Sequence, residues 1–165
     1  MLIRQRYWNG YTCMNRDDLP QMPAAGGLVL CGGYALLIRK HLRWDLPKGK
    51  VKKREPAEKC ALREISEETG LDKKLLSIRQ LLCRSSYISY YSYGPVNKTV
   101  DWFILDYAGS VEDPLTPDIS EDIDMCRWVA FDDLLETMQT ARYYLDPVKI
   151  HIANYLSAVP VAANS

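Results

Sequence analysis

Apolar residues occur in short runs along this chain, and glycine, proline or polar clusters separate the runs. Two runs of strand length, 24–30 and 34–39, flank the dipeptide Gly32-Gly33. A Gly-Gly pair between such runs predicts a β-hairpin, because glycine accepts the positive φ angles of a tight turn. Residues 41–51 then predict a short strand that leads into a loop rich in lysine. This part of the chain therefore predicts the start of a β-sheet.

Two later segments also have the composition of strands. Residues 75–93 are rich in Leu, Ile, Tyr and Ser, and residues 99–107 contain Thr, Val, Trp, Phe and Ile. The Gly-Pro pair at 94–95 predicts a turn between them, so the two strands are expected to be antiparallel. Residues 113–124 predict an acidic loop, and 125–131 predict one more strand.

Helical periodicity marks three further segments. Residues 56–69 begin with a proline and place apolar side chains on one stripe at about 100° per residue. Gly70 can end this helix in the left-handed conformation. A second helix is expected to start at Asp132 or Asp133 as N-cap, and a proline opens a third helix over 148–158.

Length and composition are those of a single globular domain. The chain has 165 residues, of which 47% are hydrophobic and 25% are charged. These values exclude collagen-like, coiled-coil and disordered proteins. Residues 1–23 show no sustained period and predict a lead-in with a short strand. The domain is expected to occupy 24–158, and 159–165 are expected to fray.

Basic and acidic side chains balance, with 21 of each. The whole molecule therefore has no net charge that would attract nucleic acid or an anionic membrane surface, and we expect neither as a stable partner. No apolar run approaches the roughly 18 residues of a membrane span. The five cysteines include no CxxC pair, which predicts free thiols in a reducing compartment. A cytoplasmic monomer or homodimer is expected.

The most specific chemical signal lies in the first predicted helix. Glu64, Glu67 and Glu68 stand at positions i, i+3 and i+4, which places their carboxylates on one helix face. Like charges at this spacing destabilise a helix, and a divalent cation that prefers oxygen ligands, above all Mg²⁺, would compensate. Gly49 would let the preceding loop approach closely and offer a carbonyl ligand. Arg63 would hold a glutamate by a bidentate pair.

A solvated helix face, with Arg63 and Lys59 as counter-charges, is the alternative interpretation of these glutamates. The wider sequence argues against it. Gly49 is followed by five residues, a glutamate, seven residues and then the run Arg-Glu-Ile-Ser-Glu-Glu-Thr-Gly-Leu. This region resembles the signature of the Nudix (MutT-like) hydrolases at every fixed position: Gly49, Glu55, Arg63, Glu64, Ile65, Glu67, Glu68, Gly70 and Leu71.

The resemblance implies an α/β fold, namely a Nudix-type α/β/α sandwich with a mixed β-sheet between the motif helix and the C-terminal helices. It also implies a bound Mg²⁺, for which Mn²⁺ can substitute. Glu67 and Glu68 would ligate the metal, and Gly49 would contribute its carbonyl oxygen. Glu64 would ligate the metal or act as general base on the attacking water. Arg63 would assist catalysis by holding these carboxylates.

Other residues of the pattern would support the motif. The resemblance implies that Glu55 braces the loop by pairing with Arg63, and Gly70 closes the helix. Relatives often recruit one more metal-ligating acid from a later loop, where this chain has Glu121 and Asp122. Glu121 is the preferred candidate of the two, and a plain acidic loop is the alternative.

Basic side chains crowd the entrance of the predicted site, at Lys48, Lys50, Lys52, Lys53 and Arg54. Lys48 and Lys50 flank the motif glycine and are expected to contact substrate phosphate. Lys52 and Lys53 are equally compatible with a solvated loop.

The stretch 44–50 is similar to the diadenosine polyphosphate and diphosphoinositol polyphosphate branch of the family. Lys98 resembles a lysine that those enzymes direct at phosphate, and Tyr87 lies where diadenosine polyphosphate hydrolases often carry a tyrosine. Trp44 or Tyr87 would be able to stack on a purine, although both residue types more often pack in cores. Arg39 is a further candidate substrate contact.

The expected activity is Mg²⁺-dependent hydrolysis of a pyrophosphate bond in a small nucleoside polyphosphate, with dinucleoside polyphosphates favoured. Nucleoside triphosphates, including oxidised ones, and diphosphoinositol polyphosphates are the alternative substrates. A hypothesis from a different class is a catalytically silent Nudix module that senses a nucleotide. Intact glutamates at all three motif positions favour the enzyme.

Overall fold

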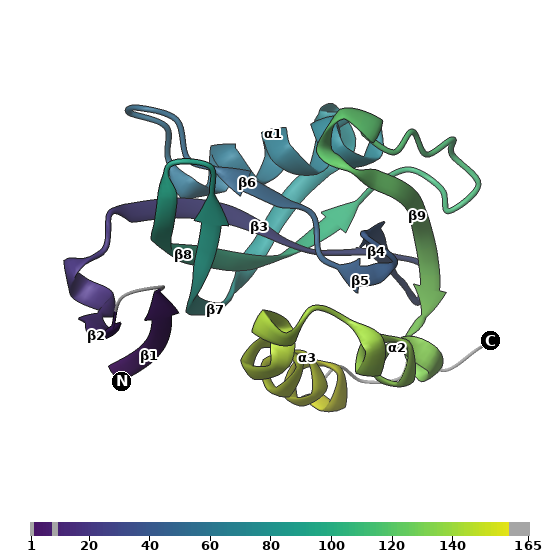
Figure 1. The fold of residues 1–165 in the computed structure, drawn as a ribbon. Coiled ribbons are helices and arrows are strands. Elements are labelled where there is room, and N and C mark those ends of the chain that lie inside the picture. Colours follow the sequence, from purple (N-terminus) through teal and green to yellow (C-terminus); the bar gives the residue numbers. More distant parts are fainter. Residues whose placement is uncertain (1, 8–9, 159–165) are drawn as a thin grey trace.

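A computed structural model describes residues 2–7 and 10–158 of the chain. A mixed β-sheet lies between helix α1 on one face and helices α2 and α3 on the other (Figure 1). The predicted Nudix-type α/β/α sandwich is therefore confirmed. The helices and strands are β1 (Leu2–Tyr7), β2 (Gly10–Asn15), η1 (Arg16–Asp18), β3 (Gln21–Cys31), β4 (Tyr34–Lys40), β5 (Arg43–Asp45), β6 (Lys48–Lys50), α1 (Ala57–Thr69), η2 (Lys73–Leu75), β7 (Leu76–Tyr91), β8 (Gly94–Tyr107), η3 (Ile119–Glu121), β9 (Ile123–Ala130), α2 (Phe131–Thr137), η4 (Met138–Thr140), η5 (Tyr143–Leu145) and α3 (Asp146–Ala158).

Strand β3 is the centre of the main sheet, in which the order is β5-β4-β3-β8-β7. It pairs in parallel with β8, and the other pairs are antiparallel. The short strand β6 also pairs with β3, where Gly49 lies opposite Ala25. This pairing fixes the loop before α1 to the central strand of the sheet.

Both faces of the sheet are covered, so adjacent residues of β3 such as Leu28 and Val29 are both buried. On one face α1 contributes Ala61 and Ile65 to an apolar cluster. On the other face, a second cluster contains residues of β3, β8, α2 and α3, among them the fully buried Trp102. The apolar stripe predicted for the first helix therefore packs against the sheet.

The turn between β3 and β4 is the predicted one, with Gly32 and Gly33 at φ angles of 53° and 86°. The turn between β7 and β8 differs from the predicted one. It lies at residues 92–93, and Gly94 and Pro95 already belong to β8. Pro95 has no backbone N–H to donate. It is tolerated in β8 because this strand pairs with β3 only from Asn97 onward, so the hydrogen bonds between β8 and β3 are unaffected.

Helix boundaries differ slightly from the sequence prediction. Pro56 is the N-cap of α1, which begins one residue later, and Gly70 ends the helix at φ 78° as predicted. The prediction that Asp132 or Asp133 caps α2 is wrong. Ala130 is the N-cap, and both aspartates lie in the first turn, where carboxylates interact favourably with the helix dipole. Helix α3 begins at Asp146, two residues before the predicted start.

The N-terminal segment forms more regular structure than the predicted short strand. Strands β1 and β2 pair as a separate antiparallel hairpin, and β3 begins at Gln21. The predicted fraying of 159–165 lies outside the described residues. Cys31, Cys60, Cys83 and Cys126 are free thiols, as predicted. None of the helices in the described residues is long and apolar enough to cross a membrane.

Candidate active site

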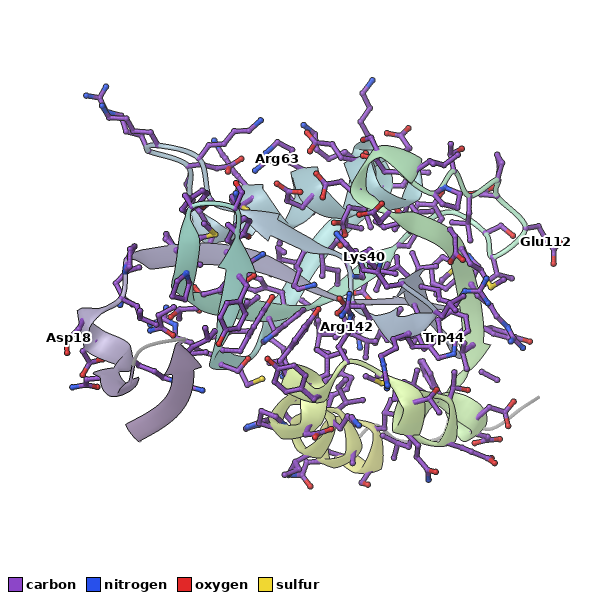
Figure 2. All side chains as sticks on the ribbon, viewed as in Figure 1. Asp18, Lys40, Trp44, Arg63, Glu112 and Arg142 are labelled. Atoms are coloured by element: carbon purple, nitrogen blue, oxygen red, sulfur yellow. The ribbon has the colours of Figure 1, made fainter. Side chains whose placement is uncertain are left out.

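A cavity of about 780 Å³ lies beside α1, and its wall is formed by the ends of β4, β7 and β8, by β6, by η3 and the residue after it, and by the α2–α3 connection. It brings together residues that the sequence predicts for catalysis, metal binding and substrate contact. Those that line the cavity are Lys48, Gly49, Lys50, Glu64, Glu68, Tyr87, Lys98 and Glu121. Figure 2 shows Arg63 on α1 and Arg142 from the α2–α3 connection well separated in the view.

Gly49 and Glu64 touch across the space between β6 and α1. A Cβ atom added to Gly49 would lie 2.0 Å from both Cδ and Oε2 of Glu64. Two non-bonded heavy atoms cannot approach that closely, so any side chain at this position would displace the carboxylate. The motif glycine therefore leaves room for the Glu64 carboxylate beside the strand, and it does not adopt an unusual backbone angle.

Arg63 connects the motif loop to the glutamates of α1. Its Nε and Nη2 atoms lie 2.8 and 2.9 Å from the two carboxylate oxygens of Glu55, which is the pair expected from the sequence. Its Nη1 atom donates to Oε1 of Glu64 and, at 3.1 Å, to Oε2 of Glu67. The loop is also fixed by the Lys52 N–H, which donates to Glu55. The hydrogen bonds from Arg63 lower the pKa of Glu55 to about 2.

Glu68 is the most buried of the three motif glutamates, and its side chain points toward the sheet. The backbone N–H of Lys48 donates to its Oε2 atom at 3.0 Å. Burial raises the pKa of Glu68 to about 7, although the charge of Lys48 opposes this shift. Burial also raises the pKa of Glu64, against the hydrogen bond from Arg63, and the charges of Glu67 and Glu121 add to the rise.

Glu67 does not join the other two motif glutamates. Its side chain is 51% exposed, pairs with Arg63 four residues earlier, and lies outside the cavity lining. Within the described part of the chain, no three His, Cys, Asp or Glu side chains are grouped closely enough to hold a metal ion. Glu64 and Glu68, one helical turn apart, share the cavity, whereas Arg63 draws Glu67 to the flank of the helix.

Both candidates for the late acid line the cavity. Glu121 lies 3.5 Å from the ammonium of Lys40, and Asp122 lies 3.6 Å from the imidazole of His41. Of the two, the charge of Glu121 acts on Glu64. Glu121 as the preferred metal-ligating acid stays a prediction, and this charge effect agrees with it.

Lys48 has a buried partner that the sequence analysis missed. Its ammonium lies 2.8 Å from Oδ2 of Asp45, and the exposed fractions of the two side chains are 8% and 0%. The Tyr144 hydroxyl also donates to Oδ2, and the Leu46 N–H donates to Oδ1. Burial alone would lower the pKa of Lys48, but the charge of Asp45 keeps it above its ordinary value.

Lys98 lies on β8 opposite Tyr87 of β7, and both side chains are buried in the cavity wall. Within the described residues, no carboxylate lies within ion-pair distance of Lys98. Burial, together with the charge of Lys48, lowers its pKa to about 8. Lys50 places its ammonium 4.4 Å from the centre of the Tyr91 ring. The Tyr87 ring stacks on Tyr144, with the ring centres 4.0 Å apart.

Two predicted substrate contacts lie away from the cavity. Arg39 forms a salt bridge of 2.9 Å with Asp124, because alternate side chains of β4 point to opposite faces and its neighbours Ile38 and Lys40 line the cavity instead. Trp44 is partly buried against the apolar cluster beneath α2 and α3. The structure thus places both residues outside the cavity, against the expectation that they contact substrate.

The cavity also contains residues that the sequence analysis did not single out, notably Lys40, His41, Arg142, Tyr143 and Tyr144. Of these, Arg142, Tyr143 and Tyr144 lie far from the motif along the chain. Only the tertiary structure places them beside it.

A family model of the NUDIX domain matches residues 20–147 of this chain. The chain belongs to the Nudix family. Nudix hydrolases generally use a divalent metal ion. Among curated relatives, this Nudix chain is 26% identical over 136 residues to the RNA pyrophosphohydrolase of Rickettsia rickettsii (strain Sheila Smith). That alignment covers 72% of this chain and 80% of the relative.

Solved structures agree on the Nudix fold. The MutT protein from Methanosarcina mazei Go1 superposes with a TM-score of 0.61 at 21% identity, over 85% of this chain and 96% of that one. A binary complex of a C. elegans Ap4A hydrolase superposes with a TM-score of 0.60 at 20% identity, over 84% of this chain and 99% of that one. At these identities the likeness shows the fold alone.

Proposed function

We propose that this Nudix protein hydrolyses a phosphoanhydride bond in a nucleoside polyphosphate, with Mg²⁺ as the metal ion. One observation carries the proposal: the carboxylates of Glu64 and Glu68 line the same cavity as the ammonium groups of Lys50 and Lys98. Carboxylates suit a divalent cation, and ammonium groups suit phosphate oxygens. The phosphates of a polyphosphate substrate would bind the metal ion held by the carboxylates and, at the same time, the ammonium groups.

The chemistry of the available donors suits Mg²⁺, with Mn²⁺ as a substitute. Glu64, Glu68, Glu121 and the carbonyl of Gly49 offer the oxygen ligands that these ions prefer. Glu68 is buried while the nearby ammonium of Lys48 is bound by Asp45, so its carboxylate lacks a cation of its own. When bound, the metal would neutralise phosphate oxygens and favour attack by water. Glu67 would become a further metal ligand once its carboxylate no longer pairs with Arg63.

The residues around the metal ligands have distinct tasks in this proposal. Oε1 of Glu64 is occupied by Arg63, so Oε2 is the atom that would bind the metal or take a proton from the attacking water. Arg63 and Glu55 hold the loop that carries Gly49 against α1. Lys50 and Lys98 would bind the phosphate groups of the substrate and stabilise the leaving phosphate.

Dinucleoside polyphosphates are the favoured substrates. Five tyrosines line the cavity, and aromatic rings of this kind stack on nucleobases, which diphosphoinositol polyphosphates lack; they are Tyr87, Tyr90, Tyr91, Tyr143 and Tyr144. The volume of about 780 Å³ is within the range of cavities that hold ligands of nucleotide size. Nucleoside triphosphates, oxidised ones included, are the second candidates.

A panel of polyphosphates tests this proposal. Product release is measured with Mg²⁺, with Mn²⁺ and with a chelator, for dinucleoside polyphosphates, nucleoside triphosphates and diphosphoinositol polyphosphates. We expect metal-dependent turnover that is fastest on the dinucleoside compounds, and we expect the chelator to abolish it. Nucleotide binding without turnover on any compound would favour a silent sensing module and contradict the proposal.

Lys98 gives the activity a defined pH dependence. Because burial lowers its pKa to about 8, the ammonium is charged below that pH and loses its attraction for phosphate above it. We expect kcat/KM to fall as the pH rises through 8, and to stay level in Lys98→Arg, which remains charged. Steady-state kinetics from pH 6.5 to 9.5 check this; the same fall in Lys98→Arg would assign it to another group.

A further inference from the structure

Arg142 is a cation in the cavity wall whose side chain has no hydrogen-bond or ion-pair partner among the residues that the structure describes. Its Nε atom is buried and has no hydrogen-bond partner, and no carboxylate of the described residues lies within ion-pair distance of its guanidinium. Buried polar groups are normally hydrogen-bonded, so the unpaired Nε shows that the described residues do not satisfy this guanidinium, and Arg142 lines the cavity where a ligand would meet it.

The other cations of the cavity differ from Arg142 in this respect. Lys40 pairs with Glu121, His41 faces Asp122, and Lys48 pairs with Asp45. Lys50 lies over the Tyr91 ring. Apart from Lys50 and Lys98, which already have a place in the proposed phosphate contacts, Arg142 is therefore the lining cation without a carboxylate partner among the described residues.

The backbone holds Arg142 in a defined position. Its N–H donates to the carbonyl of Trp44 on β5 at 2.9 Å, and its carbonyl accepts the N–H of Leu145 at 3.0 Å. Two residues later, Tyr144 is bound to Asp45 and stacked on Tyr87. The Arg142 side chain therefore extends from backbone that is held on both sides, and not from a free loop.

Arg142 enters the cavity from the layer opposite the metal ligands. Glu64 and Glu68 belong to α1 on one face of the sheet, and Arg142 comes from the connection between α2 and α3 on the other face (Figures 1 and 2). A ligand that touches both must extend across the cavity. The planar fork of a guanidinium matches the oxygens of a phosphate group and binds them by two parallel hydrogen bonds.

We infer that Arg142 is a distal phosphate-binding residue, which holds the oxygens of a phosphate group further along the chain than the bond that is cleaved. The inference rests on the proposed function and adds a substrate class to it: linear polyphosphates with at least three phosphate groups. Arg142 is then a determinant of chain-length specificity.

Binding of inorganic tripolyphosphate and of pyrophosphate, in the presence of Mg²⁺, tests the inference by calorimetry without requiring turnover. We expect Arg142→Gln to weaken tripolyphosphate binding at least tenfold and pyrophosphate binding less than threefold. Arg142→Lys keeps the charge but lacks the fork, and is expected to lose a few-fold. Arg127→Gln removes the same charge from an exposed position on β9 and is expected to change neither affinity.

An equal loss for both ligands, no loss for either, or no binding of tripolyphosphate by the wild type would each overturn the inference. A loss confined to ligands that carry a nucleobase would assign Arg142 to base recognition and would also overturn it. Thermal melting confirms that each variant is folded. Failure of the proposed function is separate, because it is seen as absent turnover in the wild type on the substrate panel.

Discussion

Glu68→Gln is expected to lower kcat for Mg²⁺-dependent hydrolysis about a thousandfold, which corresponds to about 4 kcal/mol of lost transition-state stabilisation. Glutamine keeps the size of the side chain and can still accept the hydrogen bond from the Lys48 N–H. The negative charge that would bind the metal is lost. Because the side chain is buried and the replacement is neutral, we expect the melting temperature to be unchanged or raised.

Glu58→Gln is the matched control for this variant. Glu58 lies in the first turn of the same helix, is exposed, and does not line the cavity. We expect its activity to stay within twofold of the wild type. Single-turnover and steady-state rates with Mg²⁺, together with circular dichroism, check both variants. A Glu68→Gln protein that retains more than a tenth of the wild-type rate would remove Glu68 from the metal site.

Asp45→Asn is expected to have the largest effect on stability, lowering the free energy of unfolding by about 3–5 kcal/mol. The substitution leaves the ammonium of Lys48 buried without a counter-charge, since Asp45 is the carboxylate at 2.8 Å. It also weakens the acceptor of the Tyr144 hydroxyl. Urea unfolding at pH 7, followed by fluorescence and circular dichroism, measures the change.

The double variant Asp45→Asn with Lys48→Met separates the buried charge from the rest of the site. Methionine has nearly the volume of lysine without its charge, so we expect the double variant to regain most of the stability lost in the single one. If both variants are equally unstable, the loss comes from the Tyr144 contact and not from an unpaired lysine. A single variant that loses less than 1 kcal/mol would show that solvent reaches Lys48.

The sequence predicted the layers of the fold and the core of the site because the motif is local. Gly49, Glu55 and the residues of α1 lie within one loop and one helix, so their spacing in the sequence already implies their proximity. The position of Glu67 was harder to predict. It depends on which carboxylates Arg63 binds when the helix is in place, and Arg63 binds Glu55, Glu64 and Glu67 together.

The remainder of the cavity could not be predicted, because it is assembled from distant segments. Arg142 is positioned by a hydrogen bond to β5, about a hundred residues earlier in the chain, and no local pattern marks it. Trp44 lies outside the cavity for a related reason. An aromatic residue beside a motif is as easily a core residue as a stacking surface, and the packing of α2 and α3 decides between them.

The contact between Gly49 and Glu64 makes the position of the carboxylate depend on the spacing between α1 and β6. Since there is no room for a side chain at Gly49, a small tilt of α1 toward β6 would push the end of the Glu64 side chain aside. The geometry of the proposed site therefore depends on how closely this one helix packs against the short strand.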